Sequence, residues 1–363
     1  MTVVPTRQRG ERLDPSIFDL PVEKMRDGYY SDAYFNHTRA ALLHDGRRPR
    51  VLMQVFQRKH AMLGGMDEAI AILELCSHDW PGLTVHALRD GDLVEPWESV
   101  MTIEGDYTTF SHLETVVLGT LARRTLIATN TARVLEAANG KPIIFMPARH
   151  DHHRVQTGDG YAAHVAGAIL GAEIGVTSDA QASWWGGRGV GTVPHSLIGA
   201  YGGNTVLAAT KFADWAPEDF HITVLVDYDN DSVRTALDVA RALGPRLWGV
   251  RLDTSSQLVD RALWDEMGDF DPRGVNERLV RKVRAALDQD GFEHVRIVAS
   301  GGFTVEKIES FERLGVPVDA YGVGSSLIRG ENDFTADIVM ADGRETAKVG
   351  RRFRPNERLG LVE

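Results

Sequence analysis

The second half of the chain alternates short apolar runs with helical stretches, and this alternation constrains the fold more than any other feature. The apolar runs are KPIIFMPAR, GVGTVPHS, HITVLVDYD, LWGVRLDT, HVRIVASGG and VDAYGVGSS. Strands that are apolar on both faces and separated by helices are typical of parallel β/α units. About six such units favour an α/β barrel over an open dinucleotide-binding sheet.

The first third of the chain and its tail follow other patterns. Residues 21–110 contain strand-like runs (VLMQVF, LTVHAL, SVMTIEG) and a helical stretch that begins near Gly64, which indicates an α+β unit. Residues 111–139 carry a long helical pattern that starts at a serine suited to capping and ends at Asn-Gly. The tail alternates like a hairpin that turns at Asp342-Gly343, and we expect it to rejoin the N-terminal unit.

These patterns predict four segments and one fold class. Because residues 1–20 are polar with two prolines, they are expected to form a flexible arm. The predicted segments that follow are an N-terminal α+β domain (21–110), an α/β barrel domain (111–330) and C-terminal strands that return to the N-terminal domain (331–363). The predicted fold is therefore an α/β barrel with a smaller α+β domain.

Charge and composition exclude several classes of protein. The net charge is -11, from 51 acidic and 40 basic residues, and no long basic run provides a nucleic-acid footprint. The single cysteine, Cys76, excludes an internal disulfide and a zinc site built from several cysteines. No stretch reaches the roughly 20 apolar residues of a membrane span, and the N-terminus has no signal-like apolar core. We therefore expect a cytoplasmic protein with small-molecule substrates and no membrane partner.

Nearly every unusual polar cluster lies directly after an apolar run and before a helical stretch. In β/α barrels, the loops at this end of the strands carry the active site. The side chains in these positions are Arg149 with the following HDHH, Thr192, His195, Asp227, Arg251, Asp253, Ser300, Gly301, Gly302, Gly322, Gly324 and Ser325. These residues are therefore the candidates for a functional site.

The last two clusters are glycine-rich turns on what would be neighbouring final strands. Such turns offer backbone N–H groups and a helix N-terminus to an anion, which is how barrels bind phosphate. The structural alternative is that the glycines only permit tight turns with unusual φ angles. Two such turns in succession at the end of a barrel favour phosphate.

The charged candidates also have structural alternatives. Arg251 and Asp253 share one face of a strand because they are two residues apart. An Arg fork suits a carboxylate or phosphate, and an Asp suits a ribose hydroxyl or hydrated Mg²⁺. A lone aspartate such as Asp227 more often caps the next helix. His195 lies at a strand end, where an acid, a base or a nucleophile is plausible, although a lone histidine is more often structural.

Two other motifs do not support the sites that they suggest. GGRGVGT lacks the G-x-G-x-x-G spacing and leads into a predicted strand, so it is no dinucleotide loop. The adjacent side chains of HDHH point to opposite faces of an extended chain and cannot all reach one metal ion. Substrate contact or a polar loop is the favoured role of HDHH.

Together these motifs resemble the nicotinate phosphoribosyltransferases, in particular their compact archaeal-type branch. SDAYFNHT resembles the D-x-Y-F-x-R-T element of that family, and MQVFQRK resembles the strand that follows it. MPARHDHH resembles the arginine strand, GTVPHSLI the histidine motif, VRLDTSS the R-x-D motif, and SGGF with VDAYGVGSSL the phosphate loops. The similarity covers residues 27–339 and keeps the motifs in the family's order.

The resemblance implies a partial TIM-like barrel that works as a homodimer or higher homo-oligomer with its sites between subunits. Tyr34 of one subunit would stack on the pyridine ring bound by the other. The further implied substrate contacts are Arg149, Arg251, Asp179 and Thr192, and the 5′-phosphate contacts are Ser300, Gly301, Gly302, Gly322, Gly324 and Ser325. Asp227 and Asp253 would hold the ribose and the Mg²⁺ pyrophosphate. His195 would be the histidine that ATP phosphorylates.

The implied activity joins nicotinate to phosphoribosyl pyrophosphate, with Mg²⁺ as cofactor and ATP as co-substrate, in NAD biosynthesis or salvage. His37 and His150 depart from the family pattern because they stand where arginines are expected. The C-terminal cysteine cluster of some relatives is absent, so no structural zinc is expected. The alternatives are a quinolinate or nicotinamide phosphoribosyltransferase and, more remotely, a non-catalytic nucleotide-binding relative.

Overall fold

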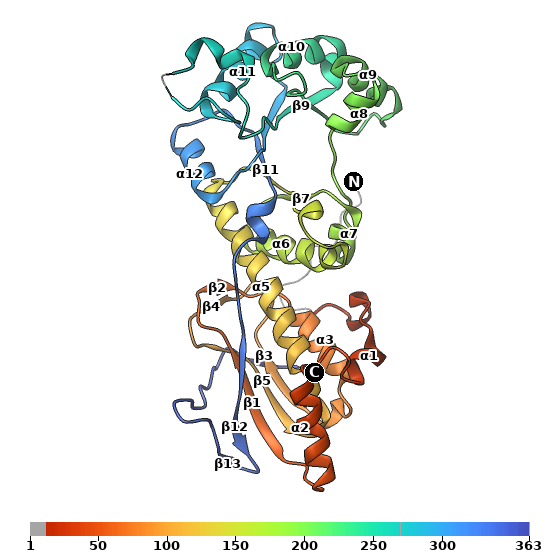
Figure 1. Cartoon of the computed structure of the whole chain (residues 1–363), viewed down its shortest axis with the longest axis vertical. Helices are drawn as coiled ribbons and strands as arrows, with labels where there is room; N and C mark the ends of the chain where they lie inside the picture. The colour runs from red at the N-terminus through yellow and green to blue at the C-terminus, as the bar shows by residue number, and fades with distance from the viewer. Residues whose placement is uncertain (1–11, 269, 363) are drawn as a thin grey trace.

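A computed structural model describes residues 12–268 and 270–362, which form an elongated molecule with a different sheet at each end (Figure 1). A parallel sheet with its helices occupies one end, and an antiparallel sheet occupies the other. The long helix α5 (Glu114–Ala137) runs between them. This arrangement confirms the predicted fold class, an α/β barrel-like unit with an N-terminal α+β unit that the C-terminal strands complete.

The N-terminal unit is built on a six-stranded sheet in the order β13-β12-β1-β5-β3-β14, with antiparallel pairing throughout. Its strands are β1 (Arg50–Phe56), β3 (Thr84–Ala87), β5 (Ser99–Asp106), β12 (Thr335–Ala341), β13 (Arg344–Glu345) and β14 (Gly360–Leu361). The β12–β13 turn uses positive φ angles at Asp342 (48°) and Gly343 (77°), as the Asp-Gly pair predicts. The tail therefore returns to the first unit, and its last strand, β14, was not predicted.

Helices and a small ribbon complete this unit. They are α1 (Val22–Arg26), α2 (Ala33–His44), α3 (Met66–Cys76), α4 (Tyr107–Phe110) and the two-stranded ribbon of β2 (Ala61–Met62) and β4 (Leu93–Val94). Ile70 and Leu73 of α3 share one buried apolar cluster with Val51 and Val55 of β1. Burial of this apolar surface is the main term that holds the unit together.

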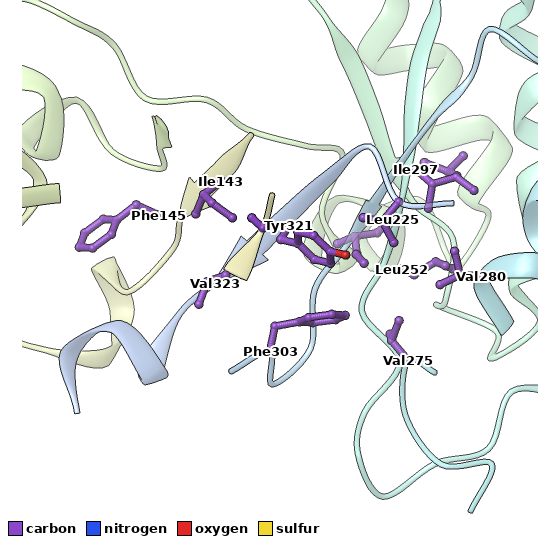
Figure 2. Packing of buried hydrophobic residues seen from close by; sticks show 14 of the residues in the cluster. Ile143, Phe145, Leu225, Leu252, Val275, Val280, Ile297, Phe303, Tyr321 and Val323 are labelled. Carbon is purple, nitrogen blue, oxygen red and sulfur yellow. The ribbon is translucent and has the colours of Figure 1, made fainter. Parts of the chain in front are cut away.

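The second unit is a parallel sheet in the order β7-β6-β11-β10-β9-β8. Its strands are β6 (Ile143–Phe145), β7 (Ile174–Val176), β8 (Ile222–Leu225), β9 (Leu247–Leu252), β10 (Arg296–Ala299) and β11 (Ala320–Val323). The helices between them are α6 (Gln156–Leu170), α7 (Asp179–Ala182), α8 (His195–Ala200), α9 (Thr205–Trp215), α10 (Ser232–Leu243), α11 (Glu277–Gln289) and α12 (Val305–Arg313). Figure 2 shows the apolar core of this unit, where the Tyr321 and Phe303 rings lie 5.3 Å apart.

The predicted strand at GVGTVPHS is wrong, because the strand in this region lies earlier, at β7. Residues 190–193 instead form a link between the two edge strands. The Val190 N–H donates to the Val176 carbonyl (2.7 Å), and the Val193 N–H donates to the Thr223 carbonyl (2.8 Å). Interspersed glycines and Pro194, which has no N–H, weaken a regular ladder here. We call residues 190–193 the closing segment.

The predicted start of the long helix is also wrong. The Asp106 side chain accepts from the Thr108 N–H and begins α4, whereas Ser111 lies in a 3-10 turn and its buried Oγ has no partner among the described residues. The helix end agrees with the prediction, because Asn139 and Gly140 both take positive φ angles. The long helix itself follows Leu113, whose side chain makes no capping hydrogen bond.

The predicted flexible arm is wrong for the part of it that the structure describes. Residues 1–11 lie outside the described residues. Arg12 pairs with Asp67 of α3 at 2.9 Å, and Phe18 is buried with its ring edge-on to Trp184 at 4.8 Å. Residues 12–20 are therefore packed between the two units. No helix among the described residues is both long and apolar enough to cross a bilayer.

Glu114, at the first turn of α5, should make stability depend on pH. Burial, together with the nearby carboxylates Asp337 and Asp32, raises the pKa of Glu114 to about 7. A raised carboxyl pKa gives stability that is complete below the unfolded pKa, near 4.5, and is lost as pH rises through about 7. Glu114→Gln should therefore gain on the order of 3 kcal/mol relative to the parent between pH 4.5 and pH 8. Urea unfolding at both pH values measures this, and an equal difference at both would contradict it.

Candidate active site

The predicted site residues of the barrel lie at one edge of the parallel sheet, where its strands end. Thr192 and His195 are placed there by the closing segment, and the others by a strand that ends beside them: Arg149 by β6, Asp179 by β7, Asp227 by β8, Arg251 and Asp253 by β9, Ser300 to Gly302 by β10, and Gly324 and Ser325 by β11. Carboxyl ends of parallel strands meet at one edge, so side chains far apart in sequence converge there.

His195 and Asp227 form the first pair of this site. The Nε2 atom of His195 lies 3.0 Å from Oδ1 of Asp227. The Asp227 side chain is only 5% exposed, while that of His195 is 42% exposed. The hydrogen bond to Asp227 raises the pKa of His195, although partial burial opposes it. An aspartate in this position orients the ring and favours the proton on Nε2, which leaves the lone pair on Nδ1.

Arg251, Asp253 and Ser300 form a second, connected cluster. Nε of Arg251 donates to Oγ of Ser300 at 2.8 Å, and its Nη2 lies 3.2 Å from Oδ2 of Asp253. The Ser300 hydroxyl lies 2.7 Å from Oδ1 of Asp253, within donating distance. Two nitrogens of one guanidinium are thus held by residues that follow β9 and β10. These contacts fix the orientation of the planar Arg251 side chain at the sheet edge.

The glycine turn after β10 has the backbone that the phosphate hypothesis needs. Gly301 (φ 86°) and Gly302 (φ 74°) are in the left-handed region, and a Cβ on Gly301 would meet the Thr254 carbonyl at 3.3 Å. The turn leads into α12, whose first backbone N–H groups point back toward it. Space next to Gly302 is open, so an anion can approach its backbone.

The turn after β11 differs from the first one. Gly322 lies inside β11 and Gly324 directly after it. Neither takes a positive φ angle, and both make room for side chains. A Cβ on Gly322 would lie 3.0 Å from Cβ of Ser300, and one on Gly324 would lie 3.0 Å from Cε1 of His150. Only a short 3-10 helix, Ser325–Ile328, follows this turn. The predicted helix N-terminus is therefore present at one of the two turns.

Tyr34 and His37 are not brought to this edge within one chain. Both lie on α2, at the far end of the molecule from the barrel (Figure 1), and Tyr34 is 60% exposed. Asp179 and Thr192 lie at the same sheet edge as the rest. Oδ1 of Asp179 accepts from the Gly189 N–H at 2.8 Å and so holds the glycine loop before the closing segment.

Sequence reasoning missed Lys307, which lies in the first turn of α12. Its ammonium approaches the Gly301 carbonyl at 3.5 Å and stands 4.3 Å above the Phe303 ring. Burial lowers the pKa of Lys307. A cation on the helix that follows the glycine turn adds to the attraction for an anion there. The signal was available, because Lys307 follows SGGF by four residues.

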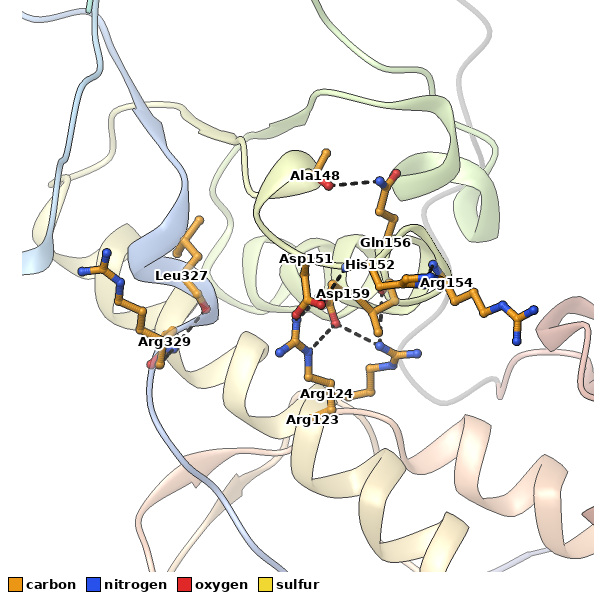
Figure 3. Close-up of polar contacts among 12 residues, drawn as sticks. Arg123, Arg124, Ala148, Asp151, His152, Arg154, Gln156, Asp159, Leu327 and Arg329 are labelled. Carbon is orange, nitrogen blue, oxygen red and sulfur yellow. Dashed lines mark hydrogen bonds and ion pairs between the residues drawn. The ribbon is translucent and has the colours of Figure 1, made fainter. Parts of the chain in front are cut away.

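A second missed feature is a buried ionic network under the HDHH segment (Figure 3). The side chain of Asp159 is only 4% exposed and forms ion pairs with Arg123 and Arg124 of α5. Arg124 also forms an ion pair with Glu68 of α3 at 2.9 Å. A Cβ on Gly158 would lie 2.0 Å from Cζ of Arg124, so a glycine is needed there. The sequence signal was two adjacent arginines in an otherwise apolar helix, LARRTLIA.

Metal binding by protein side chains alone is not indicated in the described parts of the chain. No three His, Cys, Asp or Glu side chains between residues 12 and 268 or between 270 and 362 are grouped so that they could hold one ion. Asp227 and Asp253 are hard oxygen donors of the kind that Mg²⁺ prefers, and Asp253 already contacts Arg251 and Ser300. These residues fit an ion held through water or substrate.

Comparisons with known proteins agree with the fold. Residues 32–125 match the family described as quinolinate phosphoribosyl transferase, N-terminal domain. The structure of nicotinate-nucleotide pyrophosphorylase from Pyrococcus furiosus superposes with a TM-score of 0.79 and 31% identity, over 94% of this chain and 85% of that one. Human nicotinic acid phosphoribosyltransferase shares the fold, with a TM-score of 0.68 at 18% identity over 89% and 77%.

Curated relatives carry names of the same kind. Nicotinate phosphoribosyltransferase pncB1 of Mycobacterium tuberculosis is 31% identical over 260 residues, which are 70% of this chain and 52% of that protein. Nicotinate phosphoribosyltransferase of Bacillus subtilis is 26% identical over 246 residues, 67% and 45% respectively. The chain thus spans about half the length of the curated relatives it matches.

The partial barrel joined to an α+β unit is the fold of the quinolinate and nicotinate phosphoribosyltransferases. Within that class, the chain belongs to the nicotinate phosphoribosyltransferase family.

Proposed function

We propose that the protein transfers the ribose 5-phosphate of phosphoribosyl pyrophosphate to nicotinate, releasing pyrophosphate, in NAD biosynthesis or salvage. The observation that carries this proposal is the fixed cluster of Arg251, Asp253 and Ser300 beside the His195–Asp227 pair, with a glycine turn next to it. Such an edge offers a cation for one anion, carboxylates for a sugar and backbone N–H groups for a phosphate.

The proposed reaction breaks the bond between ribose C1 and pyrophosphate and forms a bond from the pyridine nitrogen to C1. Positive charge builds on the sugar and negative charge on the leaving group, so the site must chiefly orient substrates and stabilise charge. Arg251 and Arg149 face the nicotinate carboxylate or the phosphates, and Asp227 and Asp253 face the ribose. Bound Mg²⁺ would neutralise the pyrophosphate.

The remaining predicted residues have roles in this proposal that follow from their places. In this proposal the 5′-phosphate would contact Ser300, Gly301, Gly302, Gly322, Gly324 and Ser325, and the pyridine would contact Asp179 and Thr192. The exposed Tyr34 reaches a site only in a second copy, so the proposed active form is a homodimer or higher homo-oligomer. Light scattering in solution tests this, and a monomer with full activity would overturn it.

ATP coupling is proposed to run through His195. Nδ1 is free to attack the γ-phosphorus of ATP, so that a P–N bond forms, the P–O bond to the departing ADP breaks, and water later hydrolyses the phosphohistidine. Asp227 stabilises the positively charged imidazole, since the hydrogen bond to Asp227 raises the pKa of His195. Hydrolysis then drives an otherwise poorly favoured condensation.

Quinolinate is the second candidate substrate, because of the cations that follow β6. Arg149, His150 and Arg154 are all exposed, and a second carboxylate needs such additional cations. The discriminating experiment measures mononucleotide formed from phosphoribosyl pyrophosphate with nicotinate, nicotinamide or quinolinate, each with and without ATP. Product with nicotinate alone, stimulated by ATP, supports the proposal. Product with quinolinate alone, together with CO₂ release, would replace it.

Gly301→Val should raise the KM for phosphoribosyl pyrophosphate about tenfold or more while leaving the KM for nicotinate within about twofold. Valine is strained at φ 86° and would press on the Thr254 carbonyl, so the phosphate turn must shift. Gly343→Val provides the control, since Gly343 also has a positive φ but lies in the β12–β13 turn. Equal effects on both substrates would indicate misfolding rather than loss of a phosphate site.

A further inference from the structure

We propose that Arg123 and Asn130 on α5 are positioning residues that set the distance between the loop after β6 and the loop after β11. Neither residue lies on a strand, and neither belongs to the motifs of the predicted site. The proposal rests on the proposed function for its kinetic consequences, but its structural part can be tested without substrate.

The two residues lie on the same face of α5. They are seven residues apart, which is about two helical turns, so their side chains leave the helix in nearly the same direction. On other sides of the helix, Thr125 and Thr129 accept from the backbone N–H groups of Gly64 and Met62, both at 3.1 Å. The helix is thus fixed to the N-terminal unit while it presents two polar side chains to the barrel.

Arg123 holds the loop after β6. Its Nη2 donates to Oδ2 of Asp151 at 2.8 Å and to Oδ2 of Asp159 at 2.6 Å, and its Nε donates to Oδ1 of Asp159 at 3.1 Å. Burial works against the charge of Arg123, but the bonds to Asp159 and Asp151 raise its pKa. The Arg123 guanidinium therefore connects helix α6 to the HDHH segment through charged hydrogen bonds of fixed geometry (Figure 3).

Asn130 holds the loop after β11. Its side-chain amide donates to the carbonyls of Leu327 at 3.0 Å and Arg329 at 2.9 Å. Leu327 belongs to the 3-10 helix that begins at Ser325, directly after Gly324. Figure 3 shows Leu327 and Arg329 beside the same helix that carries Arg123. Both loops are therefore tied to one helix.

The two loops touch each other where the candidate site lies. His150 precedes Asp151, the residue that Arg123 holds, and its ring stands so close to Gly324 that a Cβ there would lie 3.0 Å from Cε1. A shift of either loop changes this contact. It therefore also changes the positions of Arg149 and Gly324. Because misplacement of about 1 Å can cost roughly a hundredfold in rate, ties of this kind affect catalysis without touching substrate.

The first test uses Asp151→Asn, which breaks the charged tie but leaves the buried Asp159 and both arginines in place. Asp151 is 39% exposed, so the variant should fold and melt close to the parent. We expect hydrogen exchange to rise at least about tenfold in residues 148–155 and to stay unchanged in α10. We expect kcat/KM for phosphoribosyl pyrophosphate to fall about tenfold to a hundredfold.

Arg123→Met and the double variant complete a mutant cycle. If Arg123 acts through Asp151, the double variant should be no slower than Arg123→Met alone, because the second change removes a tie that is already broken. Asn130→Leu should raise exchange in the loop after β11 instead. Arg241→Met is the matched control, since it removes a forked pair with Asp290 on the outside of the barrel.

Unchanged exchange of residues 148–155 in Asp151→Asn would overturn the structural part of the proposal. Raised exchange with unchanged kinetics would show that the loop does not need this tie for catalysis and would overturn the positioning role. Independent, multiplicative losses in the double variant would do the same. If even the parent forms no mononucleotide, the proposed function fails, and the exchange results still decide whether α5 holds the two loops.

Discussion

Arg251→Lys is expected to lower kcat/KM by about thirtyfold or more, although the charge is kept. The guanidinium uses Nε for Ser300 and Nη2 for Asp253, and this fork cannot be reproduced by a point-charge ammonium. Loss of one charged hydrogen bond costs about 2 kcal/mol, which corresponds to roughly thirtyfold in rate. Steady-state rates with each substrate varied in turn measure the effect.

Arg296→Lys is the matched control for that substitution. Arg296 is at the opposite, amino end of strand β10 and pairs with Asp319 on an exposed surface, so its replacement should leave the rate within about twofold. A rate for Arg251→Lys within about threefold of the parent, or roughly 0.7 kcal/mol, would show that Arg251 has no direct role.

His195→Ala is expected to abolish ATP hydrolysis and the stimulation of synthesis by ATP while slow synthesis of the mononucleotide persists. The reason is that the imidazole is the proposed phosphoryl acceptor, whereas Arg251 and the glycine turn, which we propose to bind and orient the substrates, are unchanged. Rates with and without ATP, read beside thermal melting, measure this. The imidazole is 42% exposed, so its loss should change the melting temperature little.

His221→Ala serves as the control for histidine loss, because His221 stacks on Trp248 away from the sheet edge. A purely structural His195 would behave differently: its removal would lower stability and reduce all activities together. ATP-stimulated turnover that survives in a well-folded His195→Ala enzyme would exclude the phosphohistidine and leave the transferase proposal standing.

The alternation of apolar runs with helical stretches was enough to predict the fold class. The polar residues after each run were enough to place most candidate site residues at one edge of the parallel sheet. The pairs within that edge were not predictable. His195 and Asp227 are 32 positions apart, and Arg251 and Ser300 are 49 apart. A sequence shows that both members follow strands, but only the strand order shows which of them become neighbours.

Local errors have local physical causes. GVGTVPHS is apolar enough to predict a strand, yet its glycines and Pro194 leave only the closing segment. Ser111 has the chemistry of a cap, but it lies inside a 3-10 turn, and the long helix begins only after Leu113, without a side-chain cap. The Arg123 and Arg124 network was missed because its partners come from three separate segments, around residues 68, 151 and 159.

The strands of the tail, β12 and β14, are synthesised last but complete the sheet of the N-terminal unit, which is synthesised first. While the ribosome has made only the first 330 residues, β12 has not yet paired with β1 and β14 has not yet paired with β3. The nascent N-terminal sheet is then the three strands β1, β5 and β3, with an open edge on each side. Unpaired edges of apolar strands are templates for aggregation. The N-terminal unit is therefore completed only after the barrel has been made, and until β12 and β14 emerge the newly made chain depends on a chaperone to stay out of intermolecular sheets.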